Sequence, residues 1–359
     1  MQALRIYAGP AAMQHIAKNG LQPNAVGVVP GAAGGPKGLI LGPLDRFIFG
    51  DWLAQSKHDV HLIGASIGAW RMATACLNDC VVRFLQLECD YIAQDYALKP
   101  GEKFPSADTV SNEFGHSLAS FYAGKVQQVL THPRYKLHII ASRGRHILQR
   151  EHKLATPLGY LGAFLSNAVH RKAMGAWLER VVFSSQQAAL PFDASDYRTS
   201  QVALTEANFN SALQASCSIP FMLRSVTGIP GAPRGAYWDG GITDYHLHLN
   251  YQTLDVKAPL VLYPHFQKAV VPGWLDKALK WRHPSTPFLR NVVLLAPNPD
   301  WVKTLPNAKL PDRKDFAHYG NDLQARVKAW SQAASQSEQL ADEFAAWLDR
   351  PDVGLVEAL

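Results

Sequence analysis

Short apolar runs alternate with longer amphipathic segments along the first part of the chain. The apolar runs at 25–29 and 59–63 predict buried strands, and residues 39–53 between them predict a helix. A strand, a helix and a second strand in succession are typical of a βαβ unit, which implies a parallel sheet. Further strands are expected at 135–142, 180–183, 259–263 and 291–295. Helices are expected at 11–19, 67–76, 76–97, 121–130 and 321–349, with a loop over 98–113.

Composition and organisation favour one globular unit. Of the 359 residues, 47% are hydrophobic and 18% are charged, which supplies enough apolar material for a large core. The chain has no internal repeat and no low-complexity linker, so we expect a single domain over 1–359. Its motif-bearing core is predicted at about 25–245, followed by a C-terminal elaboration at about 265–359.

Charge and cysteine content bear on compartment and partners. The 35 basic and 29 acidic residues give a net charge of +6, which fits an ordinary enzyme or attraction to an anionic phospholipid surface. Four cysteines do not suggest a disulfide framework in a chain of this length. The N-terminus lacks a signal-peptide pattern, and no stretch reaches the length of a bilayer span. We therefore expect a cytoplasmic protein, with peripheral membrane contact as an option.

The apolar run that ends at Gly64 is followed by Ser66, and a helix-compatible segment begins at Ile67. Strand, tight turn, serine and helix is the layout of a nucleophile elbow. A side chain two residues before or after such a serine would collide with the neighbouring strand or helix, which accounts for glycine at 64 and 68. The serine would lie at a helix N-terminus, where free N–H groups favour developing negative charge. Taken alone, Gly-x-Ser-x-Gly also fits an ordinary structural turn.

A glycine-rich loop at 30–38 follows the first predicted strand. It resembles a phosphate-binding P-loop only superficially, because Pro36 replaces the glycine before Lys37 and Gly38 replaces the Ser or Thr that binds magnesium. The alternative is an oxyanion hole, because glycines let backbone N–H groups approach the alkoxide that acyl transfer creates. Lys37 would then orient the loop or offset charge.

A third segment, residues 237–244, contains Asp239 followed by two glycines and preceded by an aromatic pair. Such a segment predicts a turn that aims one carboxylate, although Asp-Gly-Gly is also common in surface turns. Upstream of it, residues 215–220 read Ala-Ser-Cys-Ser-Ile-Pro and follow a helical run that starts at Thr205.

In this order, the glycine-rich loop with Lys37, Gly-x-Ser-x-Gly, Ala-Ser-x-Ser-x-Pro and Asp-Gly-Gly resemble the patatin-like phospholipase family over roughly residues 25–245. The resemblance implies an α/β fold: a three-layer α/β/α sandwich with a mainly parallel central sheet, here followed by C-terminal helices. It also implies a serine acyl hydrolase that acts on lipid esters through a Ser–Asp dyad. No cofactor and no metal are implied.

The same resemblance assigns roles to individual residues. Ser66 would be the nucleophile and Asp239 its base, with Gly34 and Gly35 as oxyanion donors. The supporting positions are Lys37, Gly38, Gly64, Gly68 and Gly240. One departure from the family pattern bears on the loop geometry, because Ala33 stands where the family's Gly-Gly-Gly-x-Lys/Arg-Gly run has its first glycine.

The preferred hypothesis is an esterase that cleaves acyl esters of phospholipid, lysophospholipid or related glycerides through an acyl-enzyme. One alternative is a non-catalytic lipid-binding or interaction module on the same fold. Another is a Ser–His–Asp esterase with His246 or His248 as base, two histidines whose alternation suits one face of a strand. Ser117 stands in a Gly-His-Ser sequence like a lipase elbow, but the second glycine and the preceding strand are missing.

Two stretches suit a membrane surface. Residues 154–165 are apolar between charged flanks, and residues 272–282 combine Trp274 and Trp281 with three basic residues. Packing against the core is the alternative for both stretches. The expected partners are thus a lipid or other acyl-ester substrate and an anionic membrane surface, with no nucleic acid. The pattern does not indicate an oligomeric state.

Overall fold

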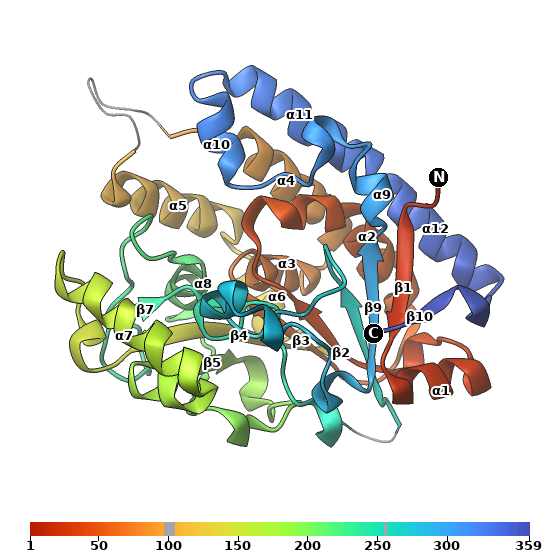
Figure 1. The fold of residues 1–359 in the computed structure, drawn as a ribbon, viewed down its shortest axis with the longest axis horizontal. Coiled ribbons are helices and arrows are strands. Elements are labelled where there is room, and N and C mark those ends of the chain that lie inside the picture. Colours follow the sequence, from red (N-terminus) through yellow and green to blue (C-terminus); the bar gives the residue numbers. More distant parts are fainter. Residues whose placement is uncertain (97–104, 255–256) are drawn as a thin grey trace.

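A computed structural model describes residues 1–96, 105–254 and 257–359 (Figure 1). Its centre is a ten-stranded sheet formed from these described residues, in the order β10-β1-β9-β8-β2-β3-β4-β5-β6, with β7 paired to β4. The strands are β1 (Leu4–Ala8), β2 (Val26–Gly31), β3 (Val60–Ala65), β4 (Tyr135–Gly144), β5 (Leu178–Ser184), β6 (Thr199–Ala203), β7 (Tyr237–Trp238), β8 (Leu260–Pro264), β9 (Val292–Pro297) and β10 (Val356–Ala358). Most neighbouring pairs are parallel, and β1–β9, β4–β5 and β4–β7 are antiparallel.

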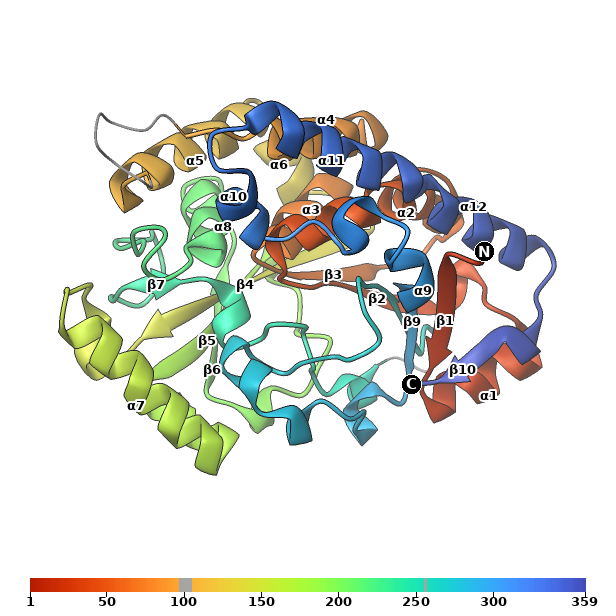
Figure 2. The ribbon, with the colours of Figure 1, turned by 45° about the horizontal axis from the view of Figure 1, so that its top comes forward.

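Helices lie on both sides of this sheet, as the α/β interpretation requires (Figure 2). One side carries α2, α3, α4, α11 and α12, while α1 and α7 lie on the other. The helices are α1 (Pro10–Asn19), α2 (Gly42–Phe47), α3 (Ile67–Ala75), α4 (Cys80–Ala93), α5 (Ala107–Phe121), α6 (Val126–Leu130), α7 (Ala155–Val169), α8 (Phe209–Cys217), α9 (Pro299–Val302), α10 (Lys314–Tyr319), α11 (Leu323–Gln336) and α12 (Glu338–Asp349). Strands β2, β8 and β9 are buried along their whole length, which explains why they read as continuous apolar runs.

Two of the predicted local elements are wrong around residue 110. The predicted loop over 98–113 holds the start of α5, which begins at Ala107 after Ser106 caps it by accepting the Thr109 N–H at 3.1 Å. The predicted helix at 121–130 is two helices, because α5 ends at Phe121 and α6 begins at Val126 after Gly124 adopts a φ of +68°. Residues 97–104, which belong to the predicted helix 76–97 and this loop, lie outside the described part.

The sheet extends beyond the motif-bearing region predicted at 25–245. Strands β8, β9 and β10 come from the C-terminal part, and β1 from the N-terminus lies between β9 and β10. Helices α11 and α12 then pack on α4 and α2. The C-terminal part therefore completes the sheet and is more than an added group of helices. None of the described helices combines the length and apolar character that crossing a bilayer requires.

The two stretches that suit a membrane surface have different environments. Helix α7 covers the first stretch, and its leucines point outward: Leu158, Leu161 and Leu165 are 62%, 53% and 56% exposed. Most of the second stretch is packed. Lys277 lies over the ring of Tyr245 at 3.8 Å from the centroid, and Arg282 pairs with the buried Asp276 at 2.9 Å. Core packing therefore describes residues 272–282 better than it describes α7.

Candidate active site

Ser66 occupies a sharp turn between β3 and α3. Its backbone has φ 57° and ψ −131°, a conformation that a residue with a side chain rarely adopts. The flanking glycines allow close packing. A Cβ on Gly64 would lie 2.3 Å from the Ala69 Cα, and a Cβ on Gly68 would lie 1.8 Å from the Gly31 carbonyl oxygen. The elbow predicted from the sequence is therefore present, with α3 pressed against the end of β2.

Asp239 reaches Ser66 from a neighbouring strand. Strand β7 pairs with the carboxyl half of β4, where Trp238 lies opposite Ser142, and Asp239 follows directly. The Ser66 hydroxyl donates a hydrogen bond of 2.6 Å to Asp239 Oδ2, and the Gly241 N–H donates to Oδ1 at 2.7 Å. A short bond of this kind is typical of a hydroxyl facing a carboxylate. The turn approaches β4 closely, because a Cβ on Gly240 would lie 2.0 Å from a β4 carbonyl oxygen.

Burial and nearby positive charges shift the pKa of Asp239 in opposite directions. Burial raises the pKa of Asp239 above its ordinary value, and the residue is only 6% exposed. The hydrogen bond from Ser66 and the positive charges of Arg313 and Lys277 lower that pKa, so they offset part of the effect. The net direction is upward, which makes the carboxylate a stronger base than an aspartate in water.

The Ala-Ser-x-Ser-x-Pro segment fixes both members of this pair through the end of α8. The Ser66 N–H donates to the Ser216 hydroxyl oxygen at 2.9 Å, and that hydroxyl donates to the Ile140 carbonyl at 2.6 Å. The Asp239 N–H donates to the Ser218 carbonyl at 2.8 Å. These contacts were not predicted from the sequence. The signal was available in the two serines, since small hydroxyl side chains are suited to bonding a nearby backbone.

The glycine-rich loop lies beside the serine. Ala33 N–H donates to the Tyr245 carbonyl at 2.9 Å, so this amide is occupied. Among the described residues, the amides of Gly34 and Gly35 have no hydrogen-bond acceptor, and Gly34 lines the same pocket as Ser66. Two amides without partners can stabilise an oxyanion. The departure at Ala33 therefore falls on an amide that already has a structural partner.

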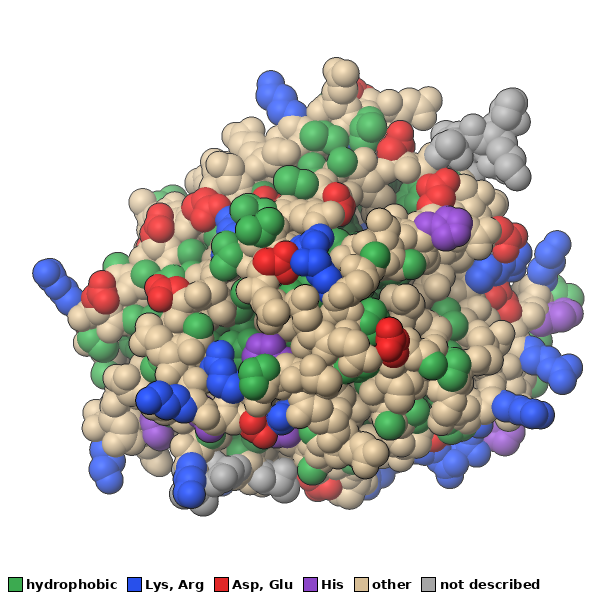
Figure 3. Space-filling model, turned by 180° about the vertical axis from the view of Figure 1, so that it is seen from behind, with side chains coloured by type: hydrophobic (Ala, Val, Ile, Leu, Met, Phe, Trp, Pro, Cys, Tyr) green, Lys and Arg blue, Asp and Glu red, His purple; other side chains and the backbone are tan. Residues whose placement is uncertain are grey.

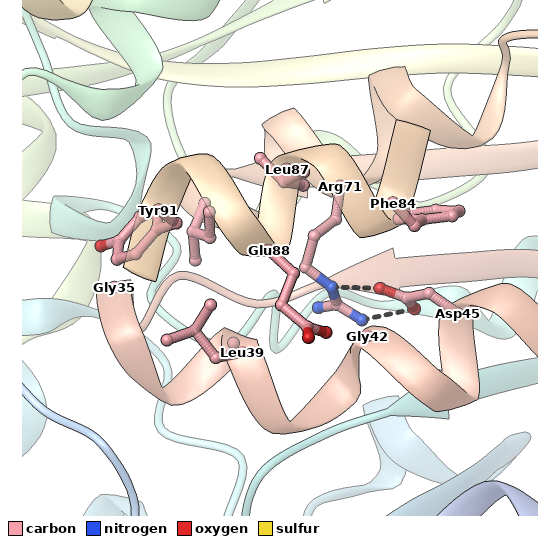
Figure 4. Close-up of a pocket in the computed structure, with 11 residues that line it drawn as sticks. Gly35, Leu39, Gly42, Asp45, Arg71, Phe84, Leu87, Glu88 and Tyr91 are labelled. Carbon is pink, nitrogen blue, oxygen red and sulfur yellow. Dashed lines mark hydrogen bonds and ion pairs between the residues drawn. The ribbon is translucent and has the colours of Figure 1, made fainter. Parts of the chain in front are cut away.

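A buried ion pair joins the helices next to this loop, as Figure 4 shows. The loop continues into a 3₁₀ helix, Gly35–Leu41, and then into α2. Arg71 on α3 donates two hydrogen bonds to Asp45 on α2, at 2.6 and 2.7 Å, and both side chains are almost fully buried. A cavity of only about 20 Å³ lies next to the pair. The helix that carries Ser66 is thus tied to the helix that follows the loop.

The pocket above Ser66 and Asp239 has a volume of about 200 Å³. One wall comes from the loop and the turn after β7, and the opposite wall comes from the C-terminal part of the chain. Four basic side chains line it: Lys37, Lys277, Arg313 and Lys314. Two of the supporting residues predicted from the sequence lie in the loop that forms one wall. Lys37 lines the pocket with its Nζ over the ring of Phe266, and Gly38 packs against Ile67. The role of Lys277 and Arg313 was not predicted.

The alternative bases and nucleophile lie elsewhere. Residues 245–248 form a turn and an irregular segment, not the strand suggested by the alternation of His246 and His248. His246 Nδ1 interacts with the Ala269 carbonyl and the Val271 N–H, at 3.1 and 3.0 Å, and burial holds its pKa well below the ordinary value.

His248 Nε2 lies 3.1 Å from the Thr286 hydroxyl, and burial lowers its pKa to about 4. Ser117 is exposed in the middle of α5. Ser66 and Asp239 are therefore the pair that the structure brings together. In the described ranges, no group of three or more His, Cys, Asp or Glu residues is placed to hold a metal ion.

Comparison with known proteins finds only distant likeness. No protein-family model matches the chain, and no curated protein matches it. Human GIVD cytosolic phospholipase A2 aligns with a TM-score of 0.39 and 11% identity, covering 98% of this chain and 66% of that chain. VipD from Legionella pneumophila aligns with a TM-score of 0.34 and 12% identity, covering 91% and 67%. The chain thus spans about two thirds of the length of either structure. At this level of similarity the chemistry of the site rests on its own geometry.

Proposed function

We propose that the protein is a serine ester hydrolase that cleaves acyl esters of phospholipid, lysophospholipid or related glycerides. The observation that carries the proposal is the hydrogen bond of 2.6 Å between Ser66 Oγ and Asp239 Oδ2 in the wall of an accessible pocket. The resemblance of four sequence motifs to patatin-like phospholipases names the same two residues, which supports a lipid ester as substrate.

In the proposed mechanism Asp239 accepts the Ser66 proton as Ser66 Oγ attacks the ester carbonyl carbon. The carbonyl oxygen becomes an alkoxide, which the amides of Gly34 and Gly35 and the N-terminus of α3 stabilise. When the intermediate collapses, protonated Asp239 gives its proton to the leaving alcohol, and Ser66 holds the acyl group. Water then attacks the acyl-enzyme, Asp239 takes the water proton, and it returns that proton to Ser66 Oγ as the acid leaves.

Two observations favour direct proton transfer to the carboxylate. Within the described chain, the sole side-chain hydrogen bond of the Ser66 hydroxyl is to Asp239. His246 and His248 hydrogen-bond to other partners, and in the described ranges no histidine is hydrogen-bonded to Ser66. A Ser–His–Asp mechanism thus has no support in this geometry.

The test is covalent labelling followed by assay. An alkyl fluorophosphonate should modify Ser66, located by mass spectrometry, and Ser66→Ala should abolish both labelling and the hydrolysis of a panel of acyl esters. Ser117→Ala is the matched control and should retain both. Labelling confined to another serine would refute the proposal. Absence of labelling and of hydrolysis in a folded protein would favour the non-catalytic lipid-binding alternative.

A further inference from the structure

The pocket above Ser66 and Asp239 carries a concentration of positive charge, contributed by both of its walls. Lys37, Lys277 and Arg313 line the pocket together with Ser66 and Asp239. In the described chain, none of these three basic residues forms an ion pair with a carboxylate. Besides Asp239, the pocket is lined by one further carboxylate, Asp312, which is paired with Lys309 at 2.9 Å. The pocket therefore has more positive than negative charge.

The positions of these cations are set by neutral neighbours. Lys277 Nζ lies 3.8 Å from the centroid of Tyr245, and Lys37 Nζ lies 5.2 Å from that of Phe266. The Arg313 guanidinium lies against the oxyanion loop, since its Nε is 3.2 Å from the position that a Cβ would take on Gly35. Aromatic rings and a glycine thus hold three like charges around one opening.

This arrangement is unfavourable without an anion. Burial, together with the charges of Arg313 and Lys37, lowers the pKa of Lys277 to about 8, although the charge of Asp239 opposes the shift. Like charges that face one opening repel each other, and a bound anion removes the repulsion. An arginine fork binds two oxygens of a phosphate or carboxylate at once, and a lysine adds a compact charge.

We propose that Lys277 and Arg313 form an anion subsite that selects esters carrying a phosphate or carboxylate near the scissile bond. This inference rests on the proposed function, because the ester is the bond that Ser66 attacks. The shared chemistry is an oxyanion a few atoms from the acyl group. The phosphate of a monoacylglycerol phosphate and the carboxylate of an acylated hydroxy acid both supply it.

The experiment compares three esters with the same short acyl chain, below their aggregation concentrations: an acylglycerol phosphate, an acylglycolate and a neutral monoacylglycerol. The full chain should cleave at least one of the two anionic esters with a kcat/KM at least tenfold above that of the neutral ester. In Lys277→Gln and Arg313→Gln this ratio should fall about ten- to hundredfold, as expected when a hydrogen bond to a charged group is lost. Using a ratio cancels any effect of the substitution on Asp239.

Lys280→Gln is the matched control, because Lys280 is exposed and lies three residues from Lys277 without lining the pocket. It should leave the ratio unchanged. Which anionic ester is preferred separates phosphate from carboxylate. An equal kcat/KM for all three esters, or a ratio unaffected by both variants, overturns the subsite.

A binding measurement distinguishes failure of the anion subsite from failure of the proposed hydrolysis. It uses calorimetry with the Ser66→Ala variant, which binds esters without cleaving them. Tighter binding of the anionic esters, weakened by adding Arg313→Gln, supports the subsite even if no ester is cleaved. Equal binding of anionic and neutral esters refutes it.

A second inference comes from the outer face of α7, and it goes beyond the proposed function. The exposed apolar residues there recur at helical spacing and form one stripe, which we call the α7 face. Its members are Leu154, Leu158, Leu161, Leu165 and Val169, which are 73%, 62%, 53%, 56% and 86% exposed. No charged residue occurs between the first and the last of them. On the side shown in Figure 3, by contrast, hydrophobic side chains lie in small patches among charged ones.

Helix α7 packs beside the entrance to the pocket. Tyr160, on the inner side of α7, contacts the ring of Phe221 at 5.9 Å between centroids. Phe221 and Met222 are 59% and 56% exposed, and they follow Ile219 and Pro220, which line the pocket. Phe221 has a φ of +69°, so the backbone is strained where the ring is presented.

The charged residues at the two ends of α7 indicate what binds to the α7 face. Exposed Arg150 and Lys153 precede the helix, and exposed Lys172 follows it. A second copy of the chain would bring positive ends together, whether the two α7 helices paired parallel or antiparallel. An anionic lipid surface meets both the apolar stripe and the basic ends. We infer that the α7 face, with Phe221 and Met222, binds an anionic lipid surface.

Vesicle sedimentation tests this second inference. The protein should bind vesicles of 70% phosphatidylcholine and 30% phosphatidylglycerol more tightly than pure phosphatidylcholine, and less tightly as salt rises. Leu158→Gln with Leu165→Gln should weaken binding at least tenfold, while cleavage of a water-soluble ester stays unchanged. The matched control is Val82→Gln with Leu85→Gln, two exposed apolar residues of α4, which should bind as the unmodified protein does.

Vesicle binding that is equal in the α7 double variant and the unmodified protein refutes the inference. A dimer in sedimentation velocity that the α7 double variant dissociates would also refute it, because a second copy would then cover the face.

Discussion

Replacing Asp239 by asparagine tests the proposed base most directly. Asparagine has nearly the shape of aspartate, and its amide oxygen can still accept the Gly241 N–H, so the turn after β7 should keep its form. The amide nitrogen that would face Ser66 is a donor and cannot take the hydroxyl proton. The change therefore removes proton acceptance and leaves packing in place.

The magnitude follows from the geometry. Ser66 and Asp239 are 5% and 6% exposed and 2.6 Å apart, so bulk water is a poor substitute for the lost base. A positioned general base contributes about 10²- to 10⁴-fold, which is about 2.7 to 5.4 kcal/mol of activation free energy. We expect kcat to fall by this factor in Asp239→Asn, toward the level of Ser66→Ala.

The assay is kcat for a short-chain ester, measured with the rate of fluorophosphonate labelling, because labelling reports serine nucleophilicity without turnover. Asp312→Asn is the matched control: it removes the same charge from the same pocket, and Asp312 makes no contact with Ser66. It should change kcat severalfold at most. If Asp239→Asn keeps more than a tenth of the activity, or if His246→Ala loses as much while remaining folded, the carboxylate is not the base.

Three further outcomes follow from the same contacts. Gly68→Ala should be destabilising by about 1–3 kcal/mol or more, measured by urea unfolding, because its methyl group would collide with the end of β2. Arg71→Met should lower stability by about 3–5 kcal/mol, because it leaves Asp45 buried without its partner, and Asp45→Leu in the same protein should restore part of the loss. Asp244 is buried and pairs with Arg180 at 2.6 Å and with Arg171 at 3.4 Å. Burial alone would raise its pKa, but these arginines hold the pKa of Asp244 below its ordinary value. Asp244 therefore stabilises the fold above the pKa of an unfolded aspartate, about 3.9, and unfolding titrations should show this contribution disappearing as pH falls below about 4.

Elements with a strong hydrophobic pattern could be predicted from the sequence. Strands β2, β3, β4, β5, β8 and β9 are predicted because their buried residues form uninterrupted or nearly uninterrupted apolar runs. Strands β1, β6, β7 and β10 are missed, since short or edge strands carry little pattern of their own and owe their conformation to pairing partners far away in sequence. Helix α5 was missed because polar residues between Val110, Phe114 and Leu118 concealed its buried face.

The site residues also separate into those that could be predicted from local sequence and those that could not. Positions that a local turn dictates, such as Gly64, Gly68 and the Asp239 turn, leave a signature in adjacent residues. The contacts of Ser216 with the elbow, and the entry of Lys277 and Arg313 into the pocket, join segments more than a hundred residues apart. Local periodicity carries no information about such contacts. The burial of Lys277 was the least predictable, because its neighbours in sequence form an amphipathic stretch typical of a surface.

The basicity of Asp239 depends on both halves of the chain. Burial beside the elbow raises the pKa of Asp239, while Arg313 and Lys277 from the C-terminal part lower it. With burial alone, the carboxyl group would take up a proton more readily and lose its function as a base nearer neutral pH. If the two cations acted on the carboxylate without the opposing effect of burial, the pKa of Asp239 would fall toward that of an ordinary surface aspartate. The same cations that favour an anionic substrate therefore keep the base ionised, and an anion bound between them would raise its affinity for the serine proton.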